Sequence, residues 1–371
     1  MSDDALRDRL DALEAAGLRR HLRVPEGIDL SSNDTLGLSR HPQVRQALQY
    51  ALEAGVPHGS GGSRLLSGQH PRWSAWEARF AAWQGTESAL HLSSGFAANS
   101  GLIAALAEPG DLILSDALNH ASLIDGARLA RADRQIVRHG CVDALSDALR
   151  RAAGRRCWVV VESVYSMDGD EPDLGAIAEL CERHSAKLIV DEAHATGMCG
   201  PTGEGRVSAL GLRPWVYATV HPLGKAFGQQ GAIIAGSATL TSWLVQRCRP
   251  FVFSTAPAPF LAAGLHAALD VVQGDAALRA RPRALADRLR AALAHRVSTG
   301  ESTSHILPIH IGDATGAMRT SDALRARGWD VRAIRPPTVP EGTSRLRVVM
   351  RACLSEGQVD ALADTLHEVL S

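Results

Sequence analysis

Short apolar runs alternate with amphipathic stretches through the first three quarters of the 371-residue chain. The apolar runs predict buried strands at residues 90–92, 111–114, 157–162, 187–191, 216–220 and 231–235. The stretches between them have helical spacing, at residues 42–54, 70–84, 97–107, 120–131, 142–152 and 173–185. Strands that alternate with helices predict an α/β fold with a mostly parallel sheet covered on both faces.

The pattern differs at the two ends of the chain. Residues 3–18 place leucines at helical spacing behind two acidic residues, which predicts a short amphipathic helix. After residue 275 we expect an α+β region with a helix at 276–296, strands at 306–311, 330–334 and 344–350, and helices at 315–327 and from 355. The expected domains are an N-terminal segment at 1–37, a large α/β domain at 38–275 and a smaller C-terminal α+β domain at 276–371.

Composition narrows the function. The 39 basic and 40 acidic residues give a formal net charge of −1, so the whole chain has no attraction for nucleic acid or an anionic membrane. The six cysteines lack C-x-x-C spacing, which argues against a zinc site and a disulfide framework, and no metal is expected. The N-terminus has no apolar signal stretch, and no apolar run reaches the ~18 residues of a membrane span. We expect a cytoplasmic protein that acts on small molecules.

Lysine occurs only twice among the 39 basic residues, and one of the two, Lys225, lies in the glycine-punctuated segment Leu223–Gly228. A lysine can lose its proton and form a Schiff base, which a guanidinium cannot do. Lys225 is therefore the first candidate for covalent chemistry. Taken alone, it could equally be an exposed lysine beside a helix.

Two further segments complete a recognisable set. The predicted strand at 187–191 ends in Asp191 and is followed by His194, at the strand end where α/β sheets place ligands. The strand at 90–92 leads into Ser93–Asn99, a turn and helix start whose free N–H groups suit a phosphate. A lysine, a buried carboxylate and a phosphate cradle together indicate pyridoxal 5′-phosphate (PLP) chemistry.

Eight blocks then follow one another in a characteristic order. They are Ser31–Asp34, Gly59–Arg64, Ser94–Asn99, Asn119–Leu123, Ser166–Asp170, Asp191–His194, Gly224–Lys225 and Arg335–Pro340. In this order they resemble the α-oxoamine synthases, a branch of the fold-type I PLP-dependent enzymes. The segment Ile334–Pro340, followed by Gly342–Arg347, is most similar to the members that make 8-amino-7-oxononanoate.

The resemblance implies the fold-type I transferase fold and a decarboxylative condensation that depends on PLP. L-Alanine would condense with a pimeloyl thioester, carried on coenzyme A or an acyl carrier protein. The products would be 8-amino-7-oxononanoate, carbon dioxide and the free thiol, as in biotin biosynthesis. The resemblance also implies a homodimer with shared active sites.

The resemblance assigns roles by position. Lys225 would carry the cofactor and later remove the substrate α-proton, Asp191 would pair with the pyridine nitrogen, and His120 would stack on the ring. His194 and Ser166 would contact the region of the phenolic oxygen.

The remaining assignments concern the phosphate and the substrates. Gly95 and Phe96 would bind the phosphate through their backbone, and Thr255 would reach it from the second subunit. The substrate-binding set comprises Arg19 at the far end of the acyl chain, Asn33 and Arg347 at the amino-acid carboxylate, and Ser63 and Thr338.

Two positions depart from the family pattern. Pro222 replaces a hydroxyl residue that normally bonds the cofactor phosphate, so we expect weaker cofactor retention unless His221, Thr219 or the partner subunit compensates. Thr35 replaces the usual tyrosine and removes an aromatic wall near the acyl-binding region.

Other functions use part of the same set. Another α-oxoamine synthase would use glycine or serine with a different acyl-CoA, and only the segment after Arg335 argues against it. A weakly PLP-binding, non-catalytic homologue is consistent with Pro222. A transaminase or lyase would share Lys225 and Asp191, but would not need the Asn119–Leu123 and Arg335–Pro340 blocks.

Overall fold

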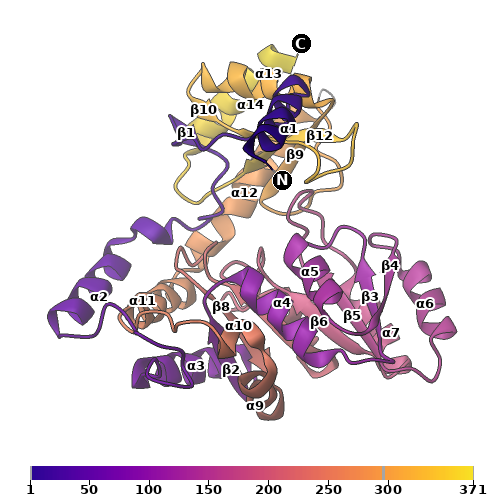
Figure 1. Ribbon diagram of the computed structural model, residues 1–371. Coiled ribbons are helices and arrows are strands. Elements are labelled where there is room, and N and C mark those ends of the chain that lie inside the picture. The colour runs from indigo at the N-terminus through magenta and orange to yellow at the C-terminus, as the bar shows by residue number, and fades with distance from the viewer. Residues whose placement is uncertain (1, 295–296, 371) are drawn as a thin grey trace. The chain divides into compact units, whose positions relative to one another are not determined.

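The computed structural model describes residues 2–294 and 297–370, and these form two compact units (Figure 1). The large unit comprises Asp34–Tyr165 and Glu171–Ala280. The small unit comprises the described residues of Met1–Asn33, Ser166–Asp170 and Arg281–Ser371.

A seven-stranded sheet runs through the large unit, in the order β2-β8-β7-β6-β5-β3-β4. Strand β8 is antiparallel to both of its neighbours, while the other described strands of the sheet run parallel to one another. The mostly parallel sheet predicted from the apolar runs is confirmed. The strands are β2 (Ser88–Leu92), β3 (Leu112–Asp116), β4 (Asp133–Val137), β5 (Cys157–Glu162), β6 (Lys187–Asp191), β7 (Val216–Pro222) and β8 (Ala232–Gly236).

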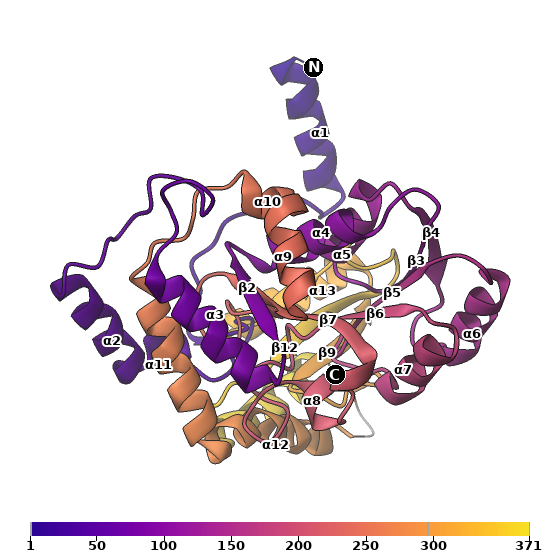
Figure 2. The ribbon, with the colours of Figure 1, turned by 90° about the horizontal axis from the view of Figure 1, so that it is seen from below.

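Helices cover both faces of this sheet (Figure 2). Successive strand residues point to opposite faces, so in β6 Ile189 packs in the cluster of α4, while Leu188 and Val190 pack in the cluster of α6 and α7. One face carries α4 (Gly95–Leu106), α5 (Ala121–Leu129), α9 (Ala238–Arg247) and α10 (Arg249–Val252). The other carries α2 (Pro42–Glu53), α3 (Pro71–Gln84), α6 (Val142–Arg151), α7 (Leu174–Arg183) and α11 (Leu261–Gly274). The short α8 spans Arg206–Ala209.

Some elements of the large unit were not predicted. Strand β4 begins with the polar residues Asp133, Arg134 and Gln135, and it pairs only with β3 at the edge of the sheet. An edge strand with an exposed side does not need a continuous apolar run, so the pattern missed it. Helices α9 to α11 were also missed. In α11 apolar residues surround most of the helix, which hides the helical period.

The small unit contains a three-stranded antiparallel sheet in the order β11-β12-β9 and a short parallel pair, β1 with β10. Its apolar core lies between these strands and the helices α12, α13 and α14, whereas α1 has no buried residue. The strands are β1 (Ile28–Asp29), β9 (Ile306–Gly312), β10 (Trp329–Asp330), β11 (Arg332–Ile334) and β12 (Ser344–Val349). The helices are α1 (Asp3–Ala15), α12 (Ala276–Leu293), whose first residues belong to the large unit, α13 (Ala314–Arg325) and α14 (Glu356–Leu370).

Two predicted helix ends need correction. The helix expected at 3–18 ends at Ala15, because Gly17 adopts a left-handed conformation with φ of 65°. The helix expected at 276–296 ends at Leu293, and residues 295 and 296 lie outside the described residues. Among the helices described, none is long and apolar enough to cross a membrane.

Candidate active site

Asp191 is the last residue of β6, and its carboxylate is held by two donors. The side chain is buried, its Oδ1 accepts the backbone N–H of Ala193 at 2.8 Å, and its Oδ2 accepts Nδ2 of Asn99 at 2.6 Å. The first bond is local and the second comes from α4, so the strand end and the helix together orient the carboxylate. The predicted strand-end carboxylate is therefore present and buried.

Lys225 lies in the loop that joins β7 to β8. Its Nζ is 2.9 Å from Nε2 of His194, which follows Asp191 by three residues. The loop closes at Gly228, where φ is +60° and an added Cβ would collide with the backbone of Leu38 and Ser39. The structure thus brings the predicted lysine and the histidine after β6 into direct contact.

His120 caps the N-terminus of α5 and lies within electrostatic range of both groups. Its backbone N–H donates to Oε1 of Glu162 at 2.5 Å, and its Nδ1 accepts the backbone N–H of Ser122 at 3.2 Å. Desolvation is the largest cause that lowers the pKa of His120, and the Lys225 cation lowers that pKa further. The charge of Asp191 opposes both effects. His120 thus makes a local bond at the helix end and lies close enough to Lys225 and Asp191 for their charges to act on its ring.

The predicted phosphate cradle is the N-terminus of α4. Ser94 caps the helix by accepting the backbone N–H of Ala97 at 3.1 Å. The backbone N–H groups of Gly95 and Phe96 have no acceptor within the described parts of the chain. An added Cβ on Gly95 would lie 2.8 Å from Cγ of Pro222, so the side chain at position 222 faces this helix end. Free N–H groups at a helix N-terminus form a binding site for an anion.

His221 and Thr219 cannot replace the hydroxyl that Pro222 lacks. Residues of β7 alternate between the two faces of the sheet, and Val220 packs in the cluster of α4. His221 lies on the other face, with its ring centroid 5.1 Å from that of Phe80, and its Nε2 is 2.8 Å from Oγ1 of Thr219. The strand geometry therefore rules out His221 and Thr219 as replacements for the hydroxyl that is missing at position 222.

A second cluster of predicted residues lies in the small unit. Arg347 in β12 donates from Nη2 to Oδ1 of Asn33 at 3.1 Å, and from Nε to the carbonyl of Ser166 at 2.5 Å. Arg345, two residues earlier on the same strand, forms an ion pair with Asp168. The two arginines thus have different partners: Arg345 pairs with the carboxylate of Asp168, and Arg347 contacts Asn33 and the carbonyl of Ser166.

The residues predicted for the acyl chain, Arg19 and Thr338, make contacts within the small unit. Nε of Arg19 lies 3.6 Å from a carboxylate oxygen of Glu14, whereas Nη2 of Arg20 donates to Oγ1 of Thr338 at 2.9 Å. Arg335 donates to the carbonyl of Gly17 in the same region. Arg20, which the sequence did not single out, is thus the neighbour of Thr338, and the expected contact of Arg19 with the acyl chain stays a prediction.

Ser63 and Thr255 lie in two loops of the large unit that are bonded together. The backbone N–H of Ala256 donates to the carbonyl of Gly62 at 2.9 Å. Neither the Ser63 nor the Thr255 side chain makes a hydrogen bond within the described residues. The structure brings these two loops together and leaves both hydroxyls available.

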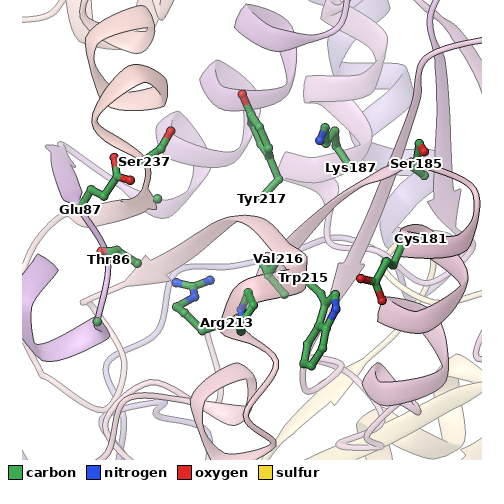
Figure 3. Close-up of a pocket in the computed structure, with 15 residues that line it drawn as sticks. Thr86, Glu87, Cys181, Ser185, Lys187, Arg213, Trp215, Val216, Tyr217 and Ser237 are labelled. Carbon is green, nitrogen blue, oxygen red and sulfur yellow. The ribbon is translucent and has the colours of Figure 1, made fainter.

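The second lysine of the chain is at the wrong end of the sheet for this chemistry. Lys187 begins β6, whereas Asp191 ends it, and Lys187 lines a separate cavity of about 600 Å³ together with Arg213, Trp215 and Tyr217 (Figure 3). Its Nζ lies 5.8 Å from the centroid of the Tyr217 ring. Of the two lysines, only Lys225 lies near the buried carboxylate at the carboxyl ends of the strands, in contact with His194.

Three residues of the site were not predicted. Asn99 and Ser122 lie inside two of the recognised sequence blocks, yet nothing in the sequence indicated that they contact each other, with Nδ2 of Asn99 2.9 Å from Oγ of Ser122. Glu162 ends β5 beside Asp191 and binds the backbone of His120. The sequence signal for Glu162 is the same as for Asp191, a buried strand that ends in a carboxylate.

The donor set of the large unit fits PLP. It provides an amine, a buried carboxylate, an imidazole and a pair of N–H groups at a helix N-terminus. These correspond to the aldehyde, pyridine nitrogen, ring face and phosphate of that cofactor. Across the described residues, no group of histidine, cysteine, aspartate and glutamate side chains is arranged to hold a metal ion.

Comparisons with known proteins agree with this arrangement. The family model for class I and II aminotransferases matches residues 25–366. The chain is 46% identical to 8-amino-7-oxononanoate synthase of Anaeromyxobacter sp. (strain K), over 97% of this chain and 94% of that protein. It is 42% identical to the enzyme of the same name from Paracidovorax citrulli, over 99% of this chain and 94% of that protein.

Solved structures show the same fold. Serine palmitoyltransferase of Sphingomonas wittichii superposes with a TM-score of 0.90 at 29% identity, covering 99% of this chain and 96% of that one. The 8-amino-7-oxononanoate synthase of Francisella tularensis superposes with a TM-score of 0.79 at 25% identity, covering 92% of this chain and 97% of that one.

Proposed function

Because the chain belongs to the class I and II aminotransferase family, we propose that it is a PLP-dependent C-acyltransferase that makes 8-amino-7-oxononanoate for biotin biosynthesis. The substrates are L-alanine and a pimeloyl thioester of coenzyme A or an acyl carrier protein. The observation that carries the proposal is the near full-length identity of 46% to a relative of that name. The contact between Lys225 and His194 beside the buried Asp191 supports it.

The cofactor, when bound, supplies an electron sink that stabilises negative charge on the amino-acid α-carbon. Lys225 would hold its aldehyde carbon, Asp191 its pyridine nitrogen and His120 one face of its ring. His194 and Ser166 would bind the region of its phenolic oxygen.

The phosphate would lie against the N-terminus of α4. The backbone N–H groups of Gly95 and Phe96 would bind it there, since the structure shows no other acceptor for them among the described residues. Thr255 of a second copy would supply a hydroxyl. This assignment makes the functional form a homodimer.

The amine of Lys225 is the group that would move the substrate proton. Nε2 of His194 lies 2.9 Å from Nζ, so it can accept or return a proton and hold the amine in one position. Holding the amine in one position would favour the transfer, because proton transfer needs the donor and acceptor atoms aligned.

Arg347 and Asn33 would bind the amino-acid carboxylate. The guanidinium already donates to Oδ1 of Asn33, so the two groups form one polar surface of the small unit. Arg19 and Thr338 would meet the far end of the acyl chain, and Ser63 would lie near the amino acid. We place the reaction in the cytoplasm.

The test is product formation by the purified protein with PLP. Alanine, glycine or serine is supplied together with pimeloyl-CoA or a pimeloyl acyl carrier protein, free thiol is measured, and the product is identified by mass. The proposal expects 8-amino-7-oxononanoate with alanine and loss of product in Lys225→Ala. Product with glycine or serine only would identify a different α-oxoamine synthase, and no product with any donor would favour a non-catalytic PLP-binding protein.

A further inference from the structure

Four polar side chains form a continuous line of hydrogen bonds from Asp191 to His120. Nδ2 of Asn99 lies 2.6 Å from Oδ2 of Asp191 and 2.9 Å from Oγ of Ser122, and that Oγ lies 2.8 Å from Nδ1 of His120. Asn99 is 1% exposed and Ser122 is fully buried. Water therefore cannot replace the bonds that Asn99 makes with Asp191 and Ser122, all three of which are buried. We call this set the Asn99 relay.

The direction of each bond follows from the groups involved. A carboxylate can only accept, so Asn99 must present an amide N–H to Asp191, and its second N–H points to Ser122. The Ser122 hydroxyl then has its own proton to donate to Nδ1 of His120. The backbone N–H of Ser122, which can only donate, also points to this Nδ1 at 3.2 Å. Nδ1 accepts two hydrogen bonds, and the ring proton is left on Nε2.

The unpaired oxygen of Asn99 supports this direction. Oδ1 of Asn99 is buried and has no hydrogen-bond partner among the described residues. Turning the amide over would bring this oxygen against the Asp191 carboxylate, which repels it. The side chain therefore keeps an unsatisfied oxygen so that both of its N–H bonds can serve the relay.

We propose that Asn99 is a positioning residue that keeps His120 neutral, with its proton on Nε2, while Asp191 carries its charge. Protonation of His120 requires a proton on Nδ1, which would break both bonds that this atom accepts. The negative charge of Asp191 alone would favour protonation of His120, and the relay opposes this effect. The other charged groups that face His120 are Lys225, which also disfavours a second cation, and Glu162, which binds its backbone.

The catalytic meaning of the relay rests on the proposed function. A neutral ring can stack on a cofactor whose pyridine nitrogen is protonated, whereas an imidazolium would repel that charge. Nε2–H of His120 is then a hydrogen-bond donor on the side of the ring away from the relay. The relay itself is a property of the protein chain and can be tested without turnover.

The experiment is a pH titration of histidine resonances by NMR in the full-length protein, first alone and then with PLP. His120→Gln identifies the resonance. Ser122→Ala removes the relay bonds from Asn99 to Ser122 and from Ser122 to His120, and Asn99→Ala removes those from Asn99 to Asp191 and to Ser122. The matched control is Ser100→Ala, because this buried neighbour in α4 donates to the carbonyl of Phe96 at 2.7 Å and takes no part in the relay.

The proposal expects the pKa of His120 to rise by about 0.5 to 1 unit in Ser122→Ala, since the neutral ring loses the bond from the hydroxyl. In Asn99→Ala the hydroxyl of Ser122 is no longer held in its direction by the amide, so the pKa of His120 should rise as well. The control should leave it unchanged. In the active enzyme, the acid limb of the kcat profile should move up in pH by the same amount, while KM for alanine stays within about twofold.

An unchanged pKa of His120 in Ser122→Ala overturns the proposal, as does an equal rise in the Ser100→Ala control. If Asn99→Ala does not fold, Ser122→Ala decides the question. In that variant the backbone N–H of residue 122 still donates to Nδ1 of His120, so only the hydroxyl bond is lost there. A shifted pKa in a protein that never makes product would support the relay and reject the proposed function.

Discussion

Replacing Pro222 by threonine should tighten the binding of PLP. Pro222 is the last residue of β7, and its ring faces the N-terminus of α4, with Cγ 2.8 Å from the place of a Cβ on Gly95. A threonine side chain would put a hydroxyl close to the free N–H groups of Gly95 and Phe96. That hydroxyl could donate to the same phosphate that these groups bind.

The expected gain follows from one hydrogen bond to a charged group. Such a bond contributes about 1.5 to 3 kcal/mol, which corresponds to roughly a ten- to a hundredfold lower Kd. His221 and Thr219 do not already supply the hydroxyl, because both lie on the opposite face of the sheet. The comparison between proline and threonine therefore measures the full bond.

The backbone tolerates this exchange. The N–H of Leu223 donates to the carbonyl of Gly231 at 2.9 Å, so by the alternation of an antiparallel ladder the nitrogen of residue 222 points away from β8. The pairing of β6 with β7 already ends at Asp191 and Val220. Proline thus leaves no ladder bond unmade, and its loss costs only about 0.4 to 1 kcal/mol of stability through the unfolded chain.

The assay is an equilibrium titration of the apoprotein with PLP, followed by the absorbance of the bound cofactor. Pro222→Val is the matched control, because valine has the shape of threonine without the hydroxyl. We expect a lower Kd in Pro222→Thr and little change in Pro222→Val. The reasoning fails if the natural protein binds PLP as tightly as Pro222→Thr, or if valine gives the same gain.

Three further predictions concern other residues. Borohydride reduction of the PLP-loaded protein should label the peptide that contains Lys225. The Lys187→Arg variant should keep the full label, and the Lys225→Arg variant should lose it. Peptide mapping that finds the label at Lys187 would contradict the assignment. Arg347→Gln should raise KM for alanine by roughly ten- to a hundredfold, since a charged hydrogen bond to the carboxylate is lost; steady-state kinetics in which only kcat changes would exclude this role. Burial, and to a lesser extent the charge of Arg64, lower the pKa of His91 from its usual 6.5 to about 3. Between pH 3 and 6.5, His91 therefore binds a proton in the unfolded chain but not in the folded one. Stability therefore falls as pH drops below 6.5, by about 1.4 kcal/mol per pH unit from this group; urea unfolding between pH 4 and 7 should show a shallower dependence in His91→Phe, and an identical slope would refute the contribution.

The elements that carry the site were predictable because each has a strong local pattern. The run Leu188–Val190 is apolar on both faces and ends in Asp191, as expected of a buried parallel strand. The start of α4 follows a strand through small residues with a serine cap at Ser94. Period and capping are properties of neighbouring residues, so the sequence shows them directly.

Elements with weak local patterns were not predictable. Strand β4 has an exposed polar start and is held by its pairing with β3 alone. The pairing partner supplies the hydrogen bonds, and the side chains contribute little to the choice of structure. Similarly, the contact of Arg20 with Thr338 depends on how the chain leaves α1 after Gly17, which the sequence does not show. Adjacent arginines have equal chemistry and differ only in direction.

By itself, the sequence determined which chemical groups this protein can use. A rare lysine at Lys225, a strand-end carboxylate at Asp191 and a capped helix start at Gly95 are local features, and their order along the chain identified the family. Tertiary structure alone decided how these groups act on one another. It placed Asn99 between Asp191 and Ser122, from segments 92 and 23 residues away. Hydrogen bonds need distances near 3 Å and defined directions, and only the packed fold sets these for residues far apart in the chain.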